Sequence, residues 1–349
     1  MKNISLKDVA ESLGVSTTLV SFVVNGKAKQ NGISKATENR VRQKVLELGY
    51  HANNFARILR TGKSNTIGVV VSDISNAYFA RICRNIEDYA SKEGYNVIFC
   101  SSDENCNKEN AQIKMLIEKG IDGIILAPTN KTSDAIDEIN KLEIPIILID
   151  RYYPNSNFNY VISDNYIAAQ KITQYLVGLG HRNIGFLAMS PTHTSLMTDR
   201  IKGYKDCLKK NGIKFNNSWL ITLNIKELDG EIYDKMSGFL DPENNITAII
   251  STNNRVTVAA IDYINRNGKK IPEDLSLITF GFLDVYKIIR PPITAVQLFA
   301  EKIGDKAAEM LLSKLSNNKI KIKNVIIDTL MHERESCKRI WKDEKYTDN

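Results

Sequence analysis

The chain has 349 residues, of which 43% are hydrophobic and 25% charged, and its formal net charge at pH 7 is +7. This length allows two or three domains with buried cores, and the composition is that of a soluble globular protein. The sequence excludes a membrane-spanning protein, because no apolar run approaches the roughly 18 residues that a span requires.

The cysteines and the N-terminal segment indicate a cytoplasmic protein. Five cysteines are scattered along the chain without the close spacing of metal ligands. The segment MKNISLKDVAES lacks the apolar core of a secretory signal. We therefore expect reduced thiols, a cytoplasmic location, and no metal, cofactor or membrane partner.

Two short helices joined at Gly14-Val15 are the first predicted elements, in the segment LKDVAESLGVSTTLVSFVVN. Ser5 with Asp8 forms a capping box for the first helix, and Ser16 caps the second. One arc of the second helix is apolar, and the other carries Thr17, Thr18, Ser21, Phe22 and Asn25. The pattern suits a helix-turn-helix whose second helix enters the major groove, or an ordinary helical hairpin.

The positive charge is concentrated at the N-terminus. Residues 1–65 contain eleven Lys or Arg and four Asp or Glu, so this segment carries the whole net charge. It includes a third predicted helix, from Ser34 to about Leu48. A basic segment on a neutral body is typical of a protein that binds the phosphate backbone of DNA. A solvated basic face without a partner is the alternative.

The segment Tyr50–Gly62 reads YHANNFARILRTG and contains a short apolar helical pattern beside two arginines. An isolated helix of this length is marginally stable. It must therefore pack on the body or become ordered when another molecule receives it. In a DNA-binding protein, the minor groove can receive such apolar side chains between base steps.

From Thr66 onward, short β-branched runs alternate with amphipathic helices, which predicts parallel sheets covered on both faces. The first strands are Ile67–Val71, Val97–Ser101, Gly123–Ala127 and Pro145–Asp150. The rhythm restarts with Val161–Ser163, Asn183–Ala188, Trp219–Leu223, Ile246–Ser251 and Leu275–Phe280, and ends with Val296–Leu298 and Val325–Leu330. We predict two doubly wound α/β lobes with a ligand cleft at their strand ends.

The predicted domains follow from these patterns. They are a DNA-binding head at 1–50, a hinge at 51–65, a two-lobed core at 66–337 and a polar tail at 338–349. The first lobe covers about 66–160 and 297–320, and the second about 161–296 and 321–337.

Taken together, the motifs resemble the LacI family of bacterial transcription regulators, of the lactose- and purine-repressor type, over about 330 residues. They are LKDVAESLGVSTTLVSFVVNGK, LGYHANNFARILRTGKSNTIGVVVSDISNAYFARI, DGIILAP, LIDR, ISDN, LGHRNIGFLA, DRIKGY and a terminal RESC. The resemblance implies a homodimer that binds a pseudo-palindromic operator, with a core like a periplasmic sugar-binding protein. A small molecule in the cleft, a sugar or sugar derivative, would control DNA affinity.

The resemblance also implies DNA-binding residues. Thr17, Thr18 and Phe22 match base-reading positions, Leu59 matches the leucine inserted into the minor groove, and Ala56 lets paired hinge helices approach. The family usually has a basic or polar residue where Phe22 stands, so Phe22 either contacts thymine methyls or packs into the protein. The full predicted set is Ser16, Thr17, Thr18, Ser21, Phe22, Asn25, Ala56, Arg57 and Leu59.

In the cleft, the resemblance implies effector contacts from Tyr78, Phe79, Asp150, Arg200, Asn253 and Asp284. Tyr78 and Phe79 are alternatively core residues, and Asp150 a loop cap. Leu283 interrupts the family's Gly-aromatic-Asp pattern before Asp284, and Gln297 stands near another common polar position. Arg200 and Asn253 suit a hydroxyl-rich ligand, because both are polar groups near strand ends.

Two other function classes fit less well. An enzyme is disfavoured because no GxGxxG or Walker loop is present, and none of the four histidines lies in an HExxH motif. A solute-binding receptor would share the two lobes but would need export.

Overall fold

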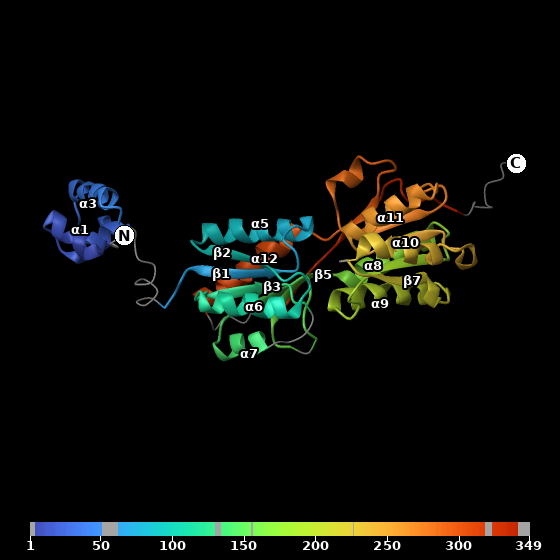
Figure 1. Ribbon diagram of the computed structural model, residues 1–349, viewed down its shortest axis with the longest axis horizontal. Coiled ribbons are helices and arrows are strands. Elements are labelled where there is room, and N and C mark those ends of the chain that lie inside the picture. The colour runs from blue at the N-terminus through green and yellow to red at the C-terminus, as the bar shows by residue number, and fades with distance from the viewer. Residues whose placement is uncertain are drawn as a thin grey trace. The chain divides into compact units, whose positions relative to one another are not determined.

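The computed structural model describes residues 4–50, 62–129, 134–154, 156–225, 227–317 and 323–340. The chain divides into two compact units, Met1–Ser64 and Asn65–Asn349 (Figure 1). Each unit has its own buried apolar core. In the described ranges, no helix has both the length and the apolar character needed to cross a membrane.

The N-terminal unit is a small helical head. It contains α1 (Leu6–Leu13), α2 (Thr17–Val24), the short 3-10 helix η1 (Lys29–Asn31) and α3 (Lys35–Glu47). The Ser5–Asp8 capping box is confirmed, and Gly14 adopts φ 66°, the left-handed conformation that ends α1. The buried core of the head contains Val9, Ala10, Val20, Val23, Ala28, Val41 and Tyr50.

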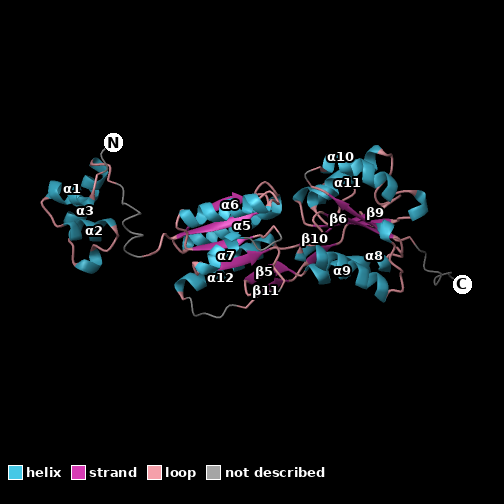
Figure 2. Ribbon diagram, turned by 60° about the horizontal axis from the view of Figure 1, so that its bottom comes forward, coloured by secondary structure: helices cyan, strands magenta, loops and turns pink. Residues whose placement is uncertain are grey.

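The second unit contains two six-stranded sheets that define its two lobes (Figure 2). The first sheet has the order β11-β5-β4-β3-β1-β2 and the second the order β12-β10-β9-β8-β6-β7. In the first lobe the strands are β1 (Thr66–Val71), β2 (Asn96–Ser101), β3 (Gly123–Leu126), β4 (Ile146–Ile149), β5 (Asn159–Ser163) and β11 (Val325–Ile327). In the second they are β6 (Ile184–Met189), β7 (Leu220–Leu223), β8 (Ala248–Ser251), β9 (Ser276–Phe280), β10 (Thr294–Gln297) and β12 (Leu330–His332).

Helices cover both faces of each sheet, as the near-continuous apolar strands predicted. In the first lobe, α5 (Ala77–Lys92) and α12 (Ala300–Ser316) pack on one face. The other face is covered by α6 (Cys106–Glu118) and α7 (Asp134–Lys141). In the second lobe, α8 (Asn165–Gly178) and α9 (Ser195–Lys210) lie opposite α10 (Leu228–Phe239) and α11 (Asn254–Arg266).

The assignment of two strands to the second lobe was wrong. Residues 161–163 lie in β5, which pairs with β4 in the first sheet, and β11 pairs in parallel with β5. The predicted strand Val325–Leu330 is divided between β11 in the first lobe and β12 in the second. An apolar run indicates a buried strand but carries no information about its hydrogen-bonding partner, so the lobe boundary was misplaced.

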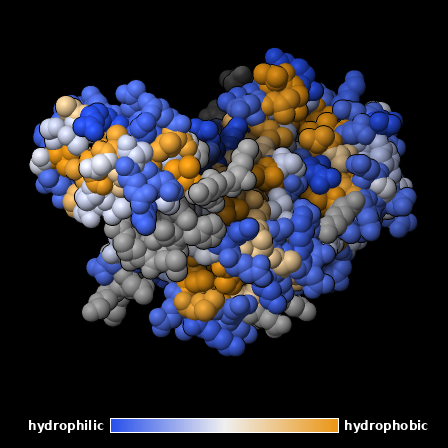
Figure 3. All heavy atoms as spheres, turned by 60° about the vertical axis from the view of Figure 1, so that its left-hand side comes forward, coloured by the Kyte–Doolittle hydropathy of each residue, from blue (hydrophilic) through white to orange (hydrophobic). Residues whose placement is uncertain are grey.

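The face of the molecule seen in Figure 3 is largely polar with local apolar patches. Leu46 on α3 is 81% exposed, and Ile288 in the second lobe is 73% exposed. Isolated exposed apolar side chains are common, whereas grouped ones indicate contact surfaces.

Candidate functional site

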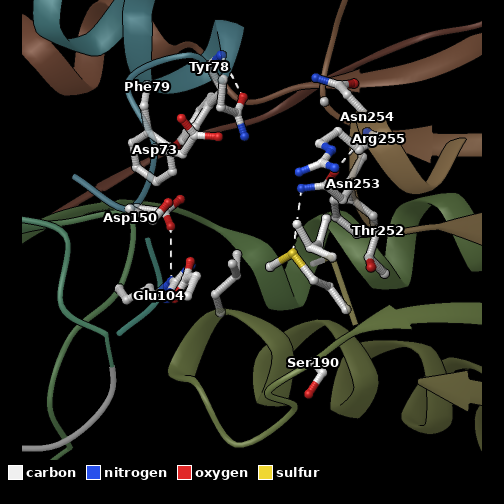
Figure 4. A pocket seen from close by; sticks show the side chains of 18 of the residues that line it. Asp73, Tyr78, Phe79, Glu104, Asp150, Ser190, Thr252, Asn253, Asn254 and Arg255 are labelled. Carbon is white, nitrogen blue, oxygen red and sulfur yellow. Dashed lines mark hydrogen bonds and ion pairs between the residues drawn. The ribbon is translucent and has the colours of Figure 1, made fainter. Parts of the chain in front are cut away.

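A cleft of about 450 Å³ lies between the two lobes of the second unit. Figure 4 shows Tyr78, Phe79 and Asp150 on one side and Asn253 and Arg255 on the other. Its lining comes largely from segments that follow the carboxyl ends of strands β1, β2, β4, β6, β7, β8 and β9, the usual ligand site of parallel α/β sheets. The lining includes Ser72, Asp73, Asn76, Tyr78, Phe79, Asp103, Glu104, Asp150, Arg151, Met189, Ser190, Leu196, Arg200, Asn224, Thr252, Asn253, Asn254, Arg255 and Phe280.

Arg200 lies in the second turn of α9 and is only 4% exposed. Its Nε donates to Asn165 Oδ1 at 2.9 Å and its Nη1 to the Thr252 carbonyl at 2.7 Å. The guanidinium also stacks over the Phe280 ring, 4.1 Å from its centroid. Burial lowers the Arg200 pKa to about 10, while the charge of Asp150 opposes that shift. Arg200 is therefore a fixed, buried cation that faces the cleft.

Asp150 follows β4 and is 6% exposed. Its Oδ2 lies 3.3 Å from Arg151 Nε. Burial raises the Asp150 pKa, and the charges of Arg151 and Arg200 oppose that increase. Because Asp150 belongs to the first lobe and Arg200 to the second, this electrostatic attraction acts across the cleft.

Arg151 and Glu104 form a second charged pair in the first lobe. Arg151 Nη1 and Nη2 lie 2.7 and 2.5 Å from the two carboxylate oxygens of Glu104. Arg151 is 3% exposed, and its pKa is raised by Glu104 and Asp150 despite the opposing effect of burial. This bidentate geometry fixes both side chains.

Tyr78 and Phe79 lie in the first turn of α5, with ring centroids 5.3 Å apart in an edge-to-face arrangement. Phe79 is 4% exposed and belongs to the core of the first lobe, while also lining the cleft. Burial raises the Tyr78 pKa well above its usual value, and so does the negative charge of Asp150. The core and cleft interpretations of Phe79 are thus compatible.

Asn253 caps the N-terminus of α11, where its Oδ1 accepts a hydrogen bond from Arg255 N at 2.7 Å. Its Nδ2 lies 3.6 Å from Met189 Sδ. Asn253 lines the cleft from the second lobe, as predicted.

Asp284 was wrongly placed in the cleft. Its carboxylate is 70% exposed and lies 3.0 Å from Arg81 Nη2 and 3.2 Å from Lys287 Nζ. These cations lower the Asp284 pKa, Lys287 most strongly. Leu283 displaces the aspartate into the 3-10 helix η4 (Asp284–Lys287). Gln297 Oε1 accepts a hydrogen bond from His332 Nε2 at 2.7 Å, and Gln297 lines a separate small pocket.

Sequence reasoning missed Glu104 and Arg151. Their place in the sequence could have indicated them, because the acidic pair in SSDEN follows β2 and the arginine in LIDR follows β4. Residues after neighbouring parallel strands meet at one sheet edge. Thr252 and Phe280 were missed because they contribute a carbonyl and a ring face, which no motif reveals.

The exposed face of α2 carries the predicted DNA-reading residues. Thr17, Thr18 and Asn25 are exposed, and Ser16 is exposed while its Oγ caps α2 by accepting from Leu19 N. Ser21 and Phe22 are half-buried. In the described part of the head, Phe22 does not belong to the apolar core. Ala56, Arg57 and Leu59 lie outside the described residues.

The basic residues of α3 form local ion pairs. Arg42 Nη2 and Lys35 Nζ lie 2.9 and 3.2 Å from the Glu38 carboxylate, and both lower its pKa, Arg42 most. Arg40 Nη2 donates to the Leu13 carbonyl at 3.5 Å, which connects α3 to the end of α1.

Comparisons with known proteins match both units. Residues 5–53 match the model of bacterial regulatory proteins of the lacI family, and residues 64–337 match the model of periplasmic binding proteins and the sugar-binding domain of the LacI family. The transcriptional repressor PurR of Pasteurella multocida is 29% identical over 313 residues, which cover 89% of this chain and 92% of that repressor.

Solved structures agree with the fold. A LacI-family regulator from Enterococcus faecium with bound ribose is 25% identical, has a TM-score of 0.70, and matches over 79% of this chain and 100% of its own. The lac repressor dimer bound to operator and the anti-inducer ONPF has a TM-score of 0.81 at 21% identity, with 97% of this chain and 100% of that chain covered.

Proposed function

This chain belongs to the LacI family of bacterial regulatory proteins, and we propose that it is a sugar-responsive repressor whose effector binds between the lobes. It is a transcriptional regulator with a helix-turn-helix head and an effector-binding core. One observation carries the proposal: buried Arg200 and Asp150 face the cleft from opposite lobes. A hydroxyl-rich ligand can hydrogen-bond to both at once.

In this proposal, α2 lies in the major groove of a pseudo-palindromic operator. The exposed hydroxyls of Thr17 and Thr18 contact base edges, and the Phe22 ring packs on thymine methyls. Ser16, Ser21 and Asn25 contribute the polar surroundings of this face. Leu59, with Ala56 and Arg57, acts at the minor groove, where an inserted apolar side chain kinks the duplex.

We further propose a homodimer, since a pseudo-palindrome presents two equivalent half-sites. Helix α5 is a candidate surface for the dimer contact. We expect no catalytic activity, and a cytoplasmic, nucleoid-associated location; turnover of a bound sugar would contradict the first point.

Operator selection tests the proposal. The full chain is used to select sites from random double-stranded DNA, and its binding is then measured with and without individual sugars. We expect a two-fold-related consensus and a sugar that changes its affinity. A variant lacking residues 1–62 should keep the sugar response in thermal unfolding but lose DNA binding. Selection of no consensus by the full chain would refute the proposed function.

A further inference from the structure

The two buried cations of the cleft have different partners: Arg151 is paired with carboxylates, whereas Arg200 donates to neutral acceptors. Arg151 Nη1 and Nη2 donate to the Glu104 carboxylate at 2.7 and 2.5 Å, and Nε lies 3.3 Å from Asp150 Oδ2 without a hydrogen bond to any described residue. Arg200 uses Nε and Nη1 to donate to Asn165 and to the Thr252 carbonyl. An incoming anion would therefore have to compete with existing partners for either guanidinium.

The whole lining carries four carboxylates and three guanidinium groups. The carboxylates belong to Asp73, Asp103, Glu104 and Asp150. Arg255 is the third arginine, and it is exposed, so water screens its charge. A phosphate or carboxylate entering this cleft would lose hydration and meet four carboxylates, and the buried cation it could approach, Arg200, already attracts Asp150 across the cleft.

The backbone of the carboxylate residues is itself unusual. Asp103 and Glu104 both have φ 51°, and Asp150 has φ 64°. L-amino acids rarely adopt this left-handed conformation, and when the surrounding structure maintains it, it is often associated with ligand sites. Here the conformation occurs at three of the four carboxylate residues of the lining, including both that neutralise Arg151.

We propose that the cleft selects an uncharged polyhydroxyl ligand and rejects its phosphorylated or carboxylated counterparts, and that Glu104 determines this selectivity. The Glu104 carboxylate occupies the two guanidinium nitrogens that would otherwise bind a phosphate or carboxylate in the same bidentate geometry. The ligand's hydroxyls donate to the remaining carboxylate oxygens and accept from arginine and amide groups. This inference rests on the proposed effector role of the cleft.

Inorganic phosphate provides a test that does not require the effector to be known. The Glu104→Gln variant removes the negative charge that pairs with the Arg151 guanidinium but preserves the size of the side chain at position 104. In buffers matched for ionic strength, phosphate should raise the melting temperature of Glu104→Gln by much more than it raises the melting temperature of the original chain. Equal responses of the two proteins to phosphate would overturn the role of Glu104.

Asp73→Asn is the matched control. Asp73 also lines the cleft, but its carboxylate accepts from Ser75 N at 2.8 Å and Ser75 Oγ at 2.6 Å and is not paired with Arg151. The change in net charge equals that of Glu104→Gln, yet no buried guanidinium is released. A phosphate response as large as that of Glu104→Gln would show that net charge, rather than the freed Arg151, is responsible, and would refute the proposal.

A second experiment compares neutral sugars with their own phosphates and uronic acids by calorimetric titration of the full chain. We expect binding by a neutral sugar to be about tenfold or more tighter than by its charged counterparts, because like charges across a binding site are strongly unfavourable. Tighter binding of a phosphate or uronate, or binding of charged members alone, would overturn the proposal. So would the failure of every neutral sugar in a broad panel.

The double variant Glu104→Gln/Arg151→Gln distinguishes a folding defect from a change of selectivity. It removes both charges, so it avoids an unpaired buried cation. It should lose the phosphate response of the single variant. If Glu104→Gln does not fold, the calorimetric ranking of the original chain still decides the outcome. Failure of the full chain to select an operator would instead contradict the proposed function. It would not contradict the charge selectivity of the cleft.

Discussion

Glu109 provides a quantitative test of the electrostatics beside the cleft. It lies in the first turn of α6, is 1% exposed, and accepts a hydrogen bond from Thr129 N at 2.7 Å through Oε2. Burial raises its pKa from 4.5 to about 7, although the hydrogen bonds from Thr129 and the charge of Arg151 oppose the increase. At neutral pH and above, a charged carboxylate is thus held in an environment that favours the neutral acid.

The size of the effect follows from this shift. A raised pKa in the folded state means that the folded chain binds the proton more tightly than the unfolded chain. The resulting stabilisation is fully present below pH 4.5 and is lost as the pH rises through about 7. At about 1.4 kcal/mol per pKa unit, the loss is about 3.5 kcal/mol.

Glu109→Gln removes the charge and keeps an oxygen that can accept from Thr129 N. At pH 8 the variant should melt roughly 7 °C higher than the original chain, at about 2 °C per kcal/mol for a unit of this size. At pH 4.5 the two should melt together. Melting curves between pH 4.5 and 8 measure the difference, with exposed Glu118→Gln on the same helix as a control that should follow the original chain.

The reasoning would be refuted if Glu109→Gln destabilised the chain at pH 8. It would also be refuted by a difference in melting temperature that did not change with pH. Either result would mean that the ionised carboxylate is better solvated or hydrogen-bonded than its burial indicates.

Three further predictions concern function. Phe22→Arg should redirect base preference at one position of each half-site by about 1–3 kcal/mol, since arginine binds guanine in a bidentate manner; an unchanged selected consensus would exclude Phe22 from the major groove. Arg200→Ala should abolish the effector response while operator binding persists, and a normal dose-response curve would remove Arg200 from the effector site. Arg81→Ala should raise the effector midpoint by about fivefold or less, because its pair with Asp284 joins the lobes but is exposed, and exposed ion pairs are weak. The matched variant Lys287→Ala breaks a pair within one lobe, so an equal shift in its titration would argue against a role for the contact between lobes.

The sequence was sufficient to predict the layered fold. Strands buried on both faces are apolar at every position, as in Gly123–Leu126 and Ile146–Ile149, and such runs between amphipathic helices have few other interpretations. The sequence did not show to which lobe β5 and β11 belong. Both are recognisable as strands, but the sheet they join depends on which strands they pair with. The pairing of β11 with β5 joins residues more than 150 positions apart in the chain.

Residues of the candidate site could be predicted where a single polar or charged residue lies in a recognisable motif or at a strand end. Arg200, Asp150 and Asn253 were placed correctly in the cleft by motif and strand end. Asp284 was not, because one inserted residue, Leu283, changes the path of the loop and turns the carboxylate toward Arg81. Roles that depend on the pairing of two distant residues, such as Glu104 with Arg151, require the three-dimensional structure.

The position of the charged residues explains how an effector could alter the angle between the lobes. The chain passes between the lobes after β5, after β10 and after β11, and Ser163 Oγ donates to the Leu298 carbonyl at 2.9 Å near the first two passages. Three such connections restrict relative motion to small rotations. A ligand shifts this equilibrium only by its difference in affinity for the two arrangements. Since Asp150 and Arg200 belong to different lobes, a ligand that bonds to both has its full affinity in one arrangement only, whereas a ligand held by one lobe would bind both equally and change nothing.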